Sequence, residues 1–182
     1  MGEDLSTDRL KAAIARGFEA RAAYWATIDD EMAAEQSLGA PATEADILRL
    51  EQSVGRSLPP SYRMFLALHD GWKMPGGVDL LSVGDMLGDP WRADLREWQR
   101  QCDALGEAVA ARGLVIGASR GLATKCLLDP HSVDGAGEWA FVEFNRGEAE
   151  VHPSFLAWLD ASSVDFESLL AADPDDHGGD TD

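Results

Sequence analysis

Basic residues are scarce in this sequence. Its 182 residues include 15 lysines and arginines against 33 aspartates and glutamates, which gives a formal net charge of -18, and no run of basic residues occurs. Nucleic-acid binding without sequence preference depends on cationic side chains that release counterions from the phosphates. We therefore expect no direct binding to nucleic acid, and an anionic membrane surface would repel the chain for the same reason.

Long apolar runs and cysteines are also few. The longest apolar stretches, such as residues 113–118, are far shorter than the ~20 residues that a membrane-spanning helix needs. Residues 1–5 lack the cationic start and apolar run of a secretory signal. The two cysteines, Cys102 and Cys126, show no CxxC or Cys/His spacing, so we expect buried free thiols and a cytoplasmic protein.

The sequence holds no recognisable catalytic or metal-binding motif. It has no GxSxG and no phosphate-binding loop with its lysine. The adjacent pair His69 and Asp70 would need further histidine and aspartate ligands to form a metal site. The other three histidines stand in a loop, at a helix start and in the tail. Residues 129–137 are rich in oxygen ligands but lack the spacing and the final glutamate of a calcium loop. We therefore predict no cofactor, no metal and no catalytic residue, and we expect His69 to be a hydrogen-bonded residue at a helix end.

Apolar residues at helical spacing mark the N-terminal segment, from residue 5 to about residue 34. Charged residues, Arg21 among them, fall between the apolar positions, so the pattern predicts one amphipathic helix. Its apolar stripe could pack on the protein's own core or in the groove of a partner. Gly39-Ala40-Pro41 then indicates a linker. The stripe consists of Leu10, Ile14, Phe18, Ala22, Trp25 and Ile28.

Two more helices are predicted, over residues 44–54 and from residue 60 to about residue 69. Thr43 can accept hydrogen bonds from the free amides of a first helical turn, and the acids that follow it suit the positive end of the helix dipole. Pro59 and Pro60 stand where the first turn of a helix tolerates proline. A glycine lies just past the end of each helix.

The rest of the chain alternates between strand and helix patterns. A short strand is expected over residues 78–83, followed by a helical pattern over residues 85–112 that is interrupted near residues 88–90. Further strands joined by short turns favour an antiparallel sheet. A last helix starts at Pro153, and residues 164–170 can continue it. The further strands are predicted over residues 114–117, 124–129 and 138–144, with a tight turn at 145–147 into 148–152.

Several of these residues together resemble the SMI1/KNR4 (SUKH) superfamily. The family signature is an acidic helix and a Leu-Pro-x-x-Tyr-x-x-Phe-Leu helix that ends in Asn-Gly, where Asp70 replaces the asparagine in this sequence. The order strand, turn, strand and Ser-Phe-x-x-Trp-Leu is similar to the C-terminal half of the family. The resemblance covers roughly residues 42–170. The matching residues are Thr43-Glu44-Ala45-Asp46-Ile47, Leu50-Glu51, Leu58-Pro59-Pro60-Ser61-Tyr62-Arg63-Met64-Phe65-Leu66, His69-Asp70-Gly71 and Ser154-Phe155-Leu156-Ala157-Trp158-Leu159.

The resemblance implies an α+β fold in which helices pack around a mostly antiparallel central sheet, with an extra N-terminal helix in this chain. We accordingly divide the chain into an N-terminal helix and linker (1–41), a SUKH-like domain (42–172) and an acidic tail (173–182). The composition of the tail cannot bury enough apolar surface to order itself, so we expect it to be disordered.

The resemblance also implies a function. Bacterial members of the family act mainly as immunity proteins against polymorphic or contact-dependent toxins, and fungal members act in cell-wall regulation and signalling. We therefore expect a non-catalytic protein that binds a cognate toxin domain, such as a basic nuclease or deaminase. One alternative is an intracellular scaffold or regulatory protein that docks through its N-terminal helix. The least favoured alternative is a small hydrolase that uses distant carboxylates. The sequence specifies no oligomeric state.

Aromatic residues beside acids, in the connection between the second predicted helix and the central strands, are the candidates for partner binding. Large aromatic side chains often anchor an interface, and acids suit a basic partner. Trp25, Trp139 and Trp158 fit apolar faces, so we expect them in the core. The predicted partner-binding residues are Trp72, Asp79, Asp85, Asp89 and Trp91.

Overall fold

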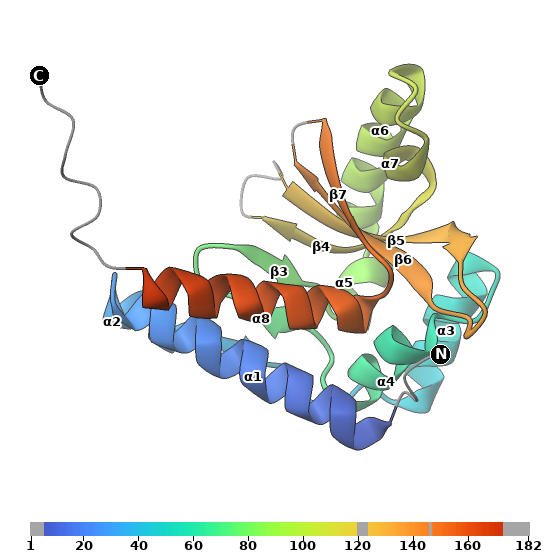
Figure 1. Ribbon diagram of the computed structural model, residues 1–182. Helices are drawn as coiled ribbons and strands as arrows, with labels where there is room; N and C mark the ends of the chain where they lie inside the picture. Colours follow the sequence, from blue (N-terminus) through green and yellow to red (C-terminus); the bar gives the residue numbers. More distant parts are fainter. Residues whose placement is uncertain (1–5, 120–123, 146, 173–182) are drawn as a thin grey trace, which may run out of the picture.

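Seven strands form one sheet in which each strand pairs with the next along the chain, always antiparallel. The computed structural model describes residues 6–119, 124–145 and 147–172, and these residues also form eight helices around the sheet (Figure 1). The predicted α+β fold with an antiparallel sheet and an N-terminal helix is thereby confirmed. The strands are β1 (Ser37–Leu38), β2 (Trp72–Lys73), β3 (Val78–Leu80), β4 (Leu114–Ser119), β5 (Thr124–Val133), β6 (Trp139–Asn145) and β7 (Glu148–His152). The helices are α1 (Thr7–Ala26), α2 (Asp30–Ala34), α3 (Glu44–Val54), α4 (Pro60–Leu68), α5 (Val83–Leu87), α6 (Asp89–Ala104), α7 (Ala108–Arg112) and α8 (Phe155–Ala171).

Local sequence signals determine the bounds of α3 and α4. The Thr43 side-chain oxygen caps α3 by accepting a hydrogen bond from the Asp46 amide, 3.2 Å away. Gly55 follows α3 with φ of 80°, the left-handed conformation that ends many helices and that favours glycine. Pro59 precedes α4 and Pro60 is its first residue. Both predicted helices are therefore confirmed.

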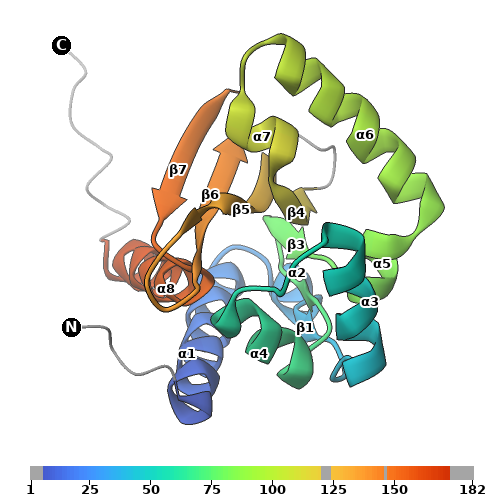
Figure 2. The same ribbon diagram turned by 90° about the vertical axis from the view of Figure 1, so that its right-hand side faces the viewer.

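Helices cover both faces of the sheet (Figure 2). The larger core joins one face to α1, α3, α4 and α8, and the smaller core joins the other face to α6 and α7. Adjacent residues of β6 point to opposite faces, so Phe141 belongs to the larger core and Val142 to the smaller one. Cys126 belongs to the larger core and Cys102 to the smaller one. Both are buried free thiols, as predicted. Burial raises the pKa of both thiols.

Aromatic rings fill the centre of the larger core. The ring of Phe155, at the start of α8, lies 5.0 Å from that of Phe65 and 5.3 Å from that of Tyr62, measured between centroids. Phe141 of β6 stacks on Trp158 of α8 at 4.4 Å. Such pairs add about 0.5–1.5 kcal/mol each beyond the apolar area that they bury. The tyrosine and phenylalanine of the Leu-Pro-x-x-Tyr-x-x-Phe helix therefore connect α4 to α8 and the sheet.

The N-terminal helix packs on its own chain. α1 lies along α8 in both views (Figures 1 and 2), and Leu10 and Ile14 are buried in the larger core. The absence of a side chain at Gly17 allows the close approach, because a Cβ there would lie 3.2 Å from a side-chain oxygen of α8. Arg16 donates two hydrogen bonds to the Glu167 carboxylate, at 2.7 and 2.6 Å. The first part of the apolar stripe is therefore buried in the protein's own core, while Phe18, Ala22 and Trp25 are half-buried.

The predicted extent of the N-terminal helix, residues 5–34, is wrong. α1 ends at Ala26, and α2 is a separate short helix that begins at Asp30. The physical reason is Asp29, whose carboxylate accepts hydrogen bonds from the amides of the first turn of α2 and so starts a new helix. Ile28, expected in the apolar stripe, is 56% exposed at this break.

The middle helices also differ from the predicted ones. The helical pattern over residues 85–112 forms α5, α6 and α7, which are separated at Gly88 and around Gly106. Val83, predicted to lie in a strand, begins α5, because Ser82 and Asp85 form a capping box there. The last helix agrees with its prediction, because α8 runs unbroken from Phe155 to Ala171 and so includes residues 164–170. None of the described helices combines the length and the apolar composition needed to cross a membrane.

His69, Asp70 and Gly71 connect the end of α4 to β1 and α5. The amide of Gly39 donates a hydrogen bond to the carbonyl oxygen of Gly71 at 3.0 Å. The Nδ1 atom of His69 lies 3.2 Å from the carbonyl oxygen of Gly39, so His69 is a half-buried, hydrogen-bonded residue, as predicted. The Asp70 carboxylate accepts a hydrogen bond from the Val83 amide at 2.7 Å. These bonds fix the position of α5 relative to α4.

Substitution of Asp70 by asparagine is expected to stabilise the fold slightly at neutral pH. Partial burial raises the pKa of the Asp70 carboxyl, as do the negative charges of Asp46 and Asp85, so folding disfavours the ionised form. Asparagine keeps an oxygen for the Val83 amide without carrying the charge. We expect the thermal unfolding midpoint at neutral pH to rise by about 1–3 °C, measured by circular dichroism.

The advantage of Asp70→Asn should depend on pH in one direction. A carboxyl whose pKa is raised by folding destabilises the folded state fully above its folded-state pKa, and that penalty disappears as the pH falls towards the unfolded-state pKa. The difference between variant and wild type should therefore shrink from neutral pH down to about pH 4. A variant that is less stable than wild type at neutral pH would show that the charge of Asp70 contributes to the fold.

Candidate partner-binding site

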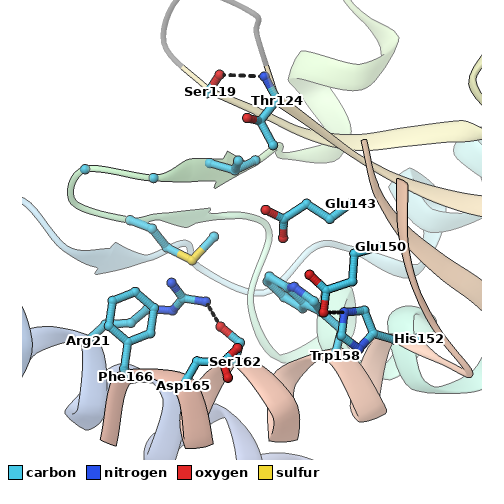
Figure 3. Close-up of a pocket in the computed structure, with 14 residues that line it drawn as sticks. Arg21, Ser119, Thr124, Glu143, Glu150, His152, Trp158, Ser162, Asp165 and Phe166 are labelled. Atoms are coloured by element: carbon cyan, nitrogen blue, oxygen red, sulfur yellow. Dashed lines mark hydrogen bonds and ion pairs between the residues drawn. The ribbon is translucent and has the colours of Figure 1, made fainter. Parts of the chain in front are cut away.

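A cavity of about 380 Å³ opens between α8 and the sheet (Figure 3). Residues of α1, of α8, of the connection between β2 and β3, and of β4, β5, β6 and β7 form its wall. Its size falls within the range of small-ligand pockets, and it can accept a long side chain of another protein. The titratable side chains that line it are Arg21, Glu143, Glu150, His152 and Asp165.

Arg21 forms the floor of this cavity. It lies on the side of α1 that packs against α8, and it is 8% exposed. Its Nη2 atom donates a hydrogen bond to the Ser162 hydroxyl. Burial lowers the pKa of Arg21 to about 10, while the negative charges of Glu143 and Asp165 act in the opposite direction. Arg21 is therefore protonated at neutral pH.

The charge of Arg21 is balanced by aromatic rings and not by a close carboxylate. Its guanidinium carbon lies 4.5 Å from the ring centroid of Phe166 and 5.8 Å from those of Trp72 and Trp158. Among the described residues, no carboxylate oxygen lies within 4.0 Å of the guanidinium nitrogens. The carboxylates around the cavity therefore form no salt bridge with Arg21.

Three carboxylates surround the mouth of the cavity. Glu143 of β6 and Glu150 of β7 are direct partners in the antiparallel register, and Asp165 stands on α8. Figure 3 shows that the two glutamates enter from the sheet, while Arg21 and Asp165 approach from the helices. Like charges directly opposite each other destabilise a sheet. Three carboxylates against one arginine make the lining negative when His152 is neutral.

This arrangement suits the binding of a cationic group. Carboxylate oxygens accept several hydrogen bonds from an ammonium or guanidinium group. Of these carboxylates, Glu150 also contacts His152, with 3.4 Å between Glu150 Oε1 and His152 Nε2. In the described part of the chain, His152 makes no hydrogen bond to a hydroxyl group. Among the described residues, no three His, Cys, Asp or Glu side chains are arranged to hold a metal ion.

Of the five predicted partner-binding residues, the four whose side chains the structure describes do not line this cavity. Trp72 is 1% exposed and its ring stacks on that of Phe18, so the prediction that Trp72 faces a partner is wrong. The physical reason is that β2 and α1 enclose its large apolar ring in the core. Asp79 is half-buried, and its carboxylate accepts a hydrogen bond from the Met74 amide at 2.9 Å.

The other three predicted residues lie at the junction of α5 and α6. Asp85 is exposed, and its carboxylate accepts hydrogen bonds from the hydroxyl and the amide of Ser82, at 2.7 and 3.3 Å. Asp89 is exposed and begins α6, where a carboxylate favours the helix dipole. Trp91 lies in α6, and its side chain is outside the part of the chain that the structure describes. Asp85 and Asp89 remain candidates for a contact with a partner.

The residues of the cavity were missed by reasoning from the sequence. The apolar spacing places Arg21 between the positions of the apolar stripe, although in the structure it continues the buried row that includes Leu10 and Ile14. Glu143 is an acid within an otherwise apolar strand, which is the available signal for a functional or paired charge. Counting residues back from the predicted turn at 145–147 would have placed Glu143 opposite Glu150.

A protein-family model matches most of this fold. The model described as "SMI1 / KNR4 family (SUKH-1)" matches residues 41–161, which is more than half of the chain. The matched segment extends from the residues before α3 into the first part of α8, so it includes β6 and β7 but not α1. No curated protein matches the sequence.

Proposed function

The chain belongs to the SMI1/KNR4 (SUKH-1) family, and from this premise we propose that it is a non-catalytic, cytoplasmic immunity protein. Its partner is the toxin domain of a polymorphic or contact-dependent bacterial system, such as a basic nuclease or deaminase. By binding this domain the chain blocks its active site or its substrate channel.

The acidic cavity between α8 and the sheet is the observation that carries this proposal. Glu143, Glu150 and Asp165 outnumber Arg21, and Glu143 faces Glu150 directly across the strands. A bound cation would relieve this repulsion, because it would make an opposite-charge contact with both carboxylates. The cavity therefore favours a partner that brings a lysine or arginine side chain to it.

The charge of the whole chain supports association with a basic partner. Residues 165–182 hold seven of the 33 acids and no base, so residues 1–164 hold 26 acids against 15 bases, a net charge of -11. An acidic surface attracts a cationic one over long range and raises the rate of encounter, and salt screens the effect. A toxin that acts on nucleic acid needs cationic residues for its phosphates, and the same residues would attract this protein.

Co-expression with the toxin domain encoded beside this gene tests the proposal. We expect the wild-type chain to restore growth of cells that express the toxin. The charge-reversed variant Glu150→Lys/Asp165→Lys should protect at least about tenfold fewer cells, because it places positive charge where the basic partner binds. The matched control is Asp94→Lys/Asp103→Lys, which reverses two exposed acids on α6 and should protect as well as the wild type.

Three results would count against the proposal. Toxicity that the wild-type chain does not relieve would contradict the immunity function, and a constitutive partner unrelated to any toxin would favour the regulatory role of the same fold. Full protection by Glu150→Lys/Asp165→Lys would show that the acidic cavity is not the contact. Thermal unfolding of each variant establishes that a loss of protection does not come from a loss of fold.

A further inference from the structure

In the part of the chain that the structure describes, β7 is the longer of the two edge strands of the sheet, and its only protection is the charge of its glutamates. β6 pairs with it over five residues without a bulge, and no described strand lies on its other side (Figure 2). At the opposite edge, β1 has only two residues. Sheet edges are commonly blocked by proline, by charged side chains, especially lysine, by a bulge or by a short strand. β7 has no proline, lysine or bulge, and its charges are those of Glu148 and Glu150, so its outer backbone groups are open to pairing with a strand that carries positive charge.

The antiparallel ladder determines which backbone groups of β7 point outward. In a hairpin closed by Asn145 and Glu148, hydrogen-bonded and non-hydrogen-bonded pairs alternate along the strands. This alternation directs Glu148 and Glu150 to β6 and turns the amides of Ala149 and Val151 to the open side. The Val151 side chain is 62% exposed. An added strand would therefore find two N–H donors with their neighbouring carbonyl groups.

The side chains of β7 decide which strand can be added. Glu148 and Glu150 are exposed on β7, and Glu143 follows on β6. A second copy of this strand would bring acids to acids across the new edge, which is unfavourable. A segment with lysine or arginine at alternate positions would instead make opposite-charge pairs with the same glutamates. Charge complementarity thus selects a basic extended segment and disfavours a dimer through this edge.

The cavity lies on the face of the sheet to which such a segment would point its basic side chains. Neighbouring strands are about 4.8 Å apart, so a residue opposite Glu150 would stand about 5 Å from Glu150 and about 10 Å from Glu143. Glu143, Glu150 and Asp165 all line the cavity. A lysine or arginine side chain at that position can therefore extend along the sheet into the mouth of the cavity.

We propose that β7 accepts a basic, extended segment of the partner as an added strand, which places a lysine or arginine side chain in the cavity beside Glu143, Glu150 and Asp165. Backbone pairing supplies affinity, and the acidic cavity supplies the selection for a basic side chain, as in other complexes formed by strand addition. This inference rests on the proposed function, because the toxin domain supplies the segment.

A synthetic peptide tests the surface without the toxin. The probe is a capped peptide of about six alternating threonine and arginine residues, the length of a typical strand, titrated into the isotope-labelled full chain and followed by NMR. We expect saturable shifts at the amides of β7, with hydrogen exchange slowed at Ala149 and Val151. The same peptide with glutamine in place of arginine should bind about tenfold more weakly. Absence of binding, or shifts centred on Asp85 and Asp89, would overturn the proposal.

Two variants separate backbone pairing from charge. Val151→Pro removes one outward N–H but no bond to β6, so it should abolish binding of the arginine peptide while the fold is kept. Glu143→Gln/Glu150→Gln removes the charge and keeps the shape, so it should weaken binding about tenfold at low salt and reduce its salt dependence. Asp94→Asn/Asp103→Asn, on exposed positions of α6, is the matched control and should bind as the wild type does. Unchanged binding by either the proline or the glutamine variant would overturn the proposal.

The toxin assay distinguishes failure of this inference from failure of the proposed function. If wild type and Val151→Pro neutralise the toxin equally, the β7 surface is wrong and the immunity function stands. If the arginine peptide binds to β7 and no toxin is neutralised, the surface stands and the immunity function is wrong. We expect neutralisation by the wild type and its loss in the proline variant.

Discussion

Replacement of Phe155 by alanine is expected to destabilise the folded protein by about 3–5 kcal/mol. Phe155 is completely buried, and its ring is in contact with those of Tyr62, Phe65 and Trp158. Alanine would leave a cavity where α4, α8 and the sheet meet, and the surrounding rings cannot collapse into it without moving these elements. For a domain of this size, the unfolding midpoint would fall by about 6–20 °C, which thermal and denaturant unfolding can measure.

Two controls on the same helix make this result specific to the aromatic cluster. Phe155→Leu keeps most of the volume and should cost about 1–2 kcal/mol. Val164→Ala, at a position that is 48% exposed, should cost less than about 0.5 kcal/mol. A loss below about 1 kcal/mol for Phe155→Ala would show that this cluster is not the centre of the core.

Replacement of Glu138 by alanine should cost about 3–4 kcal/mol. Glu138 precedes β6 and is 9% exposed, and its two carboxylate oxygens accept hydrogen bonds from the amide and the hydroxyl of Ser61, both at 2.7 Å. Ser61 is completely buried in the first turn of α4. Alanine would leave both donors unsatisfied, and it would break the contact that holds the start of α4 against the sheet.

Glu138→Gln is the matched control, because it keeps an acceptor for the Ser61 amide without a charge. It should cost about 1 kcal/mol at neutral pH. Burial raises the pKa of Glu138, so the wild type should gain stability relative to Glu138→Gln as the pH falls from neutral towards the unfolded-state pKa. An alanine variant as stable as the glutamine variant would show that the bond from the Ser61 amide contributes nothing net.

Features that depend on neighbouring residues could be predicted from the sequence. α3 and α4 follow from Thr43, from Pro59-Pro60 and from the glycines after each helix, and these signals act within one helical turn. The β6–β7 hairpin follows from its tight turn. The break between α1 and α2 was missed although its cause is also local. Asp29 can start a helix as well as continue one, and the apolar spacing alone does not separate these cases.

Features that join distant segments could not be predicted in the same way. Arg21 and Ser162 meet only because α1 packs on α8, and Ser61 meets Glu138 only because α4 packs at the end of β6. The sequence shows the charge of each residue but not its partner. Trp72 illustrates the converse error, because an aromatic residue among polar neighbours suggested a surface that the packing of α1 on β2 covers.

The candidate site therefore depends on tertiary packing, while the family signature depends on local sequence. The signature helix forms the core with Phe155, and it has no residue in the acidic cavity. β6 and β7, which supply Glu143 and Glu150, lie within the segment that the family model matches. Arg21 lies outside that segment, on the N-terminal helix. The cavity thus combines residues of the segment that the family model matches with residues outside it.

Inhibition of the purified toxin domain by the purified chain tests the proposed function most directly. The toxin domain encoded beside this gene would be titrated with the wild-type chain while its enzymatic activity is followed. We predict that its activity disappears at an equimolar ratio, and that Glu150→Lys/Asp165→Lys inhibits it at least about tenfold less effectively. A toxin domain that remains fully active in the presence of excess wild-type chain would contradict the proposal that this protein is its immunity partner.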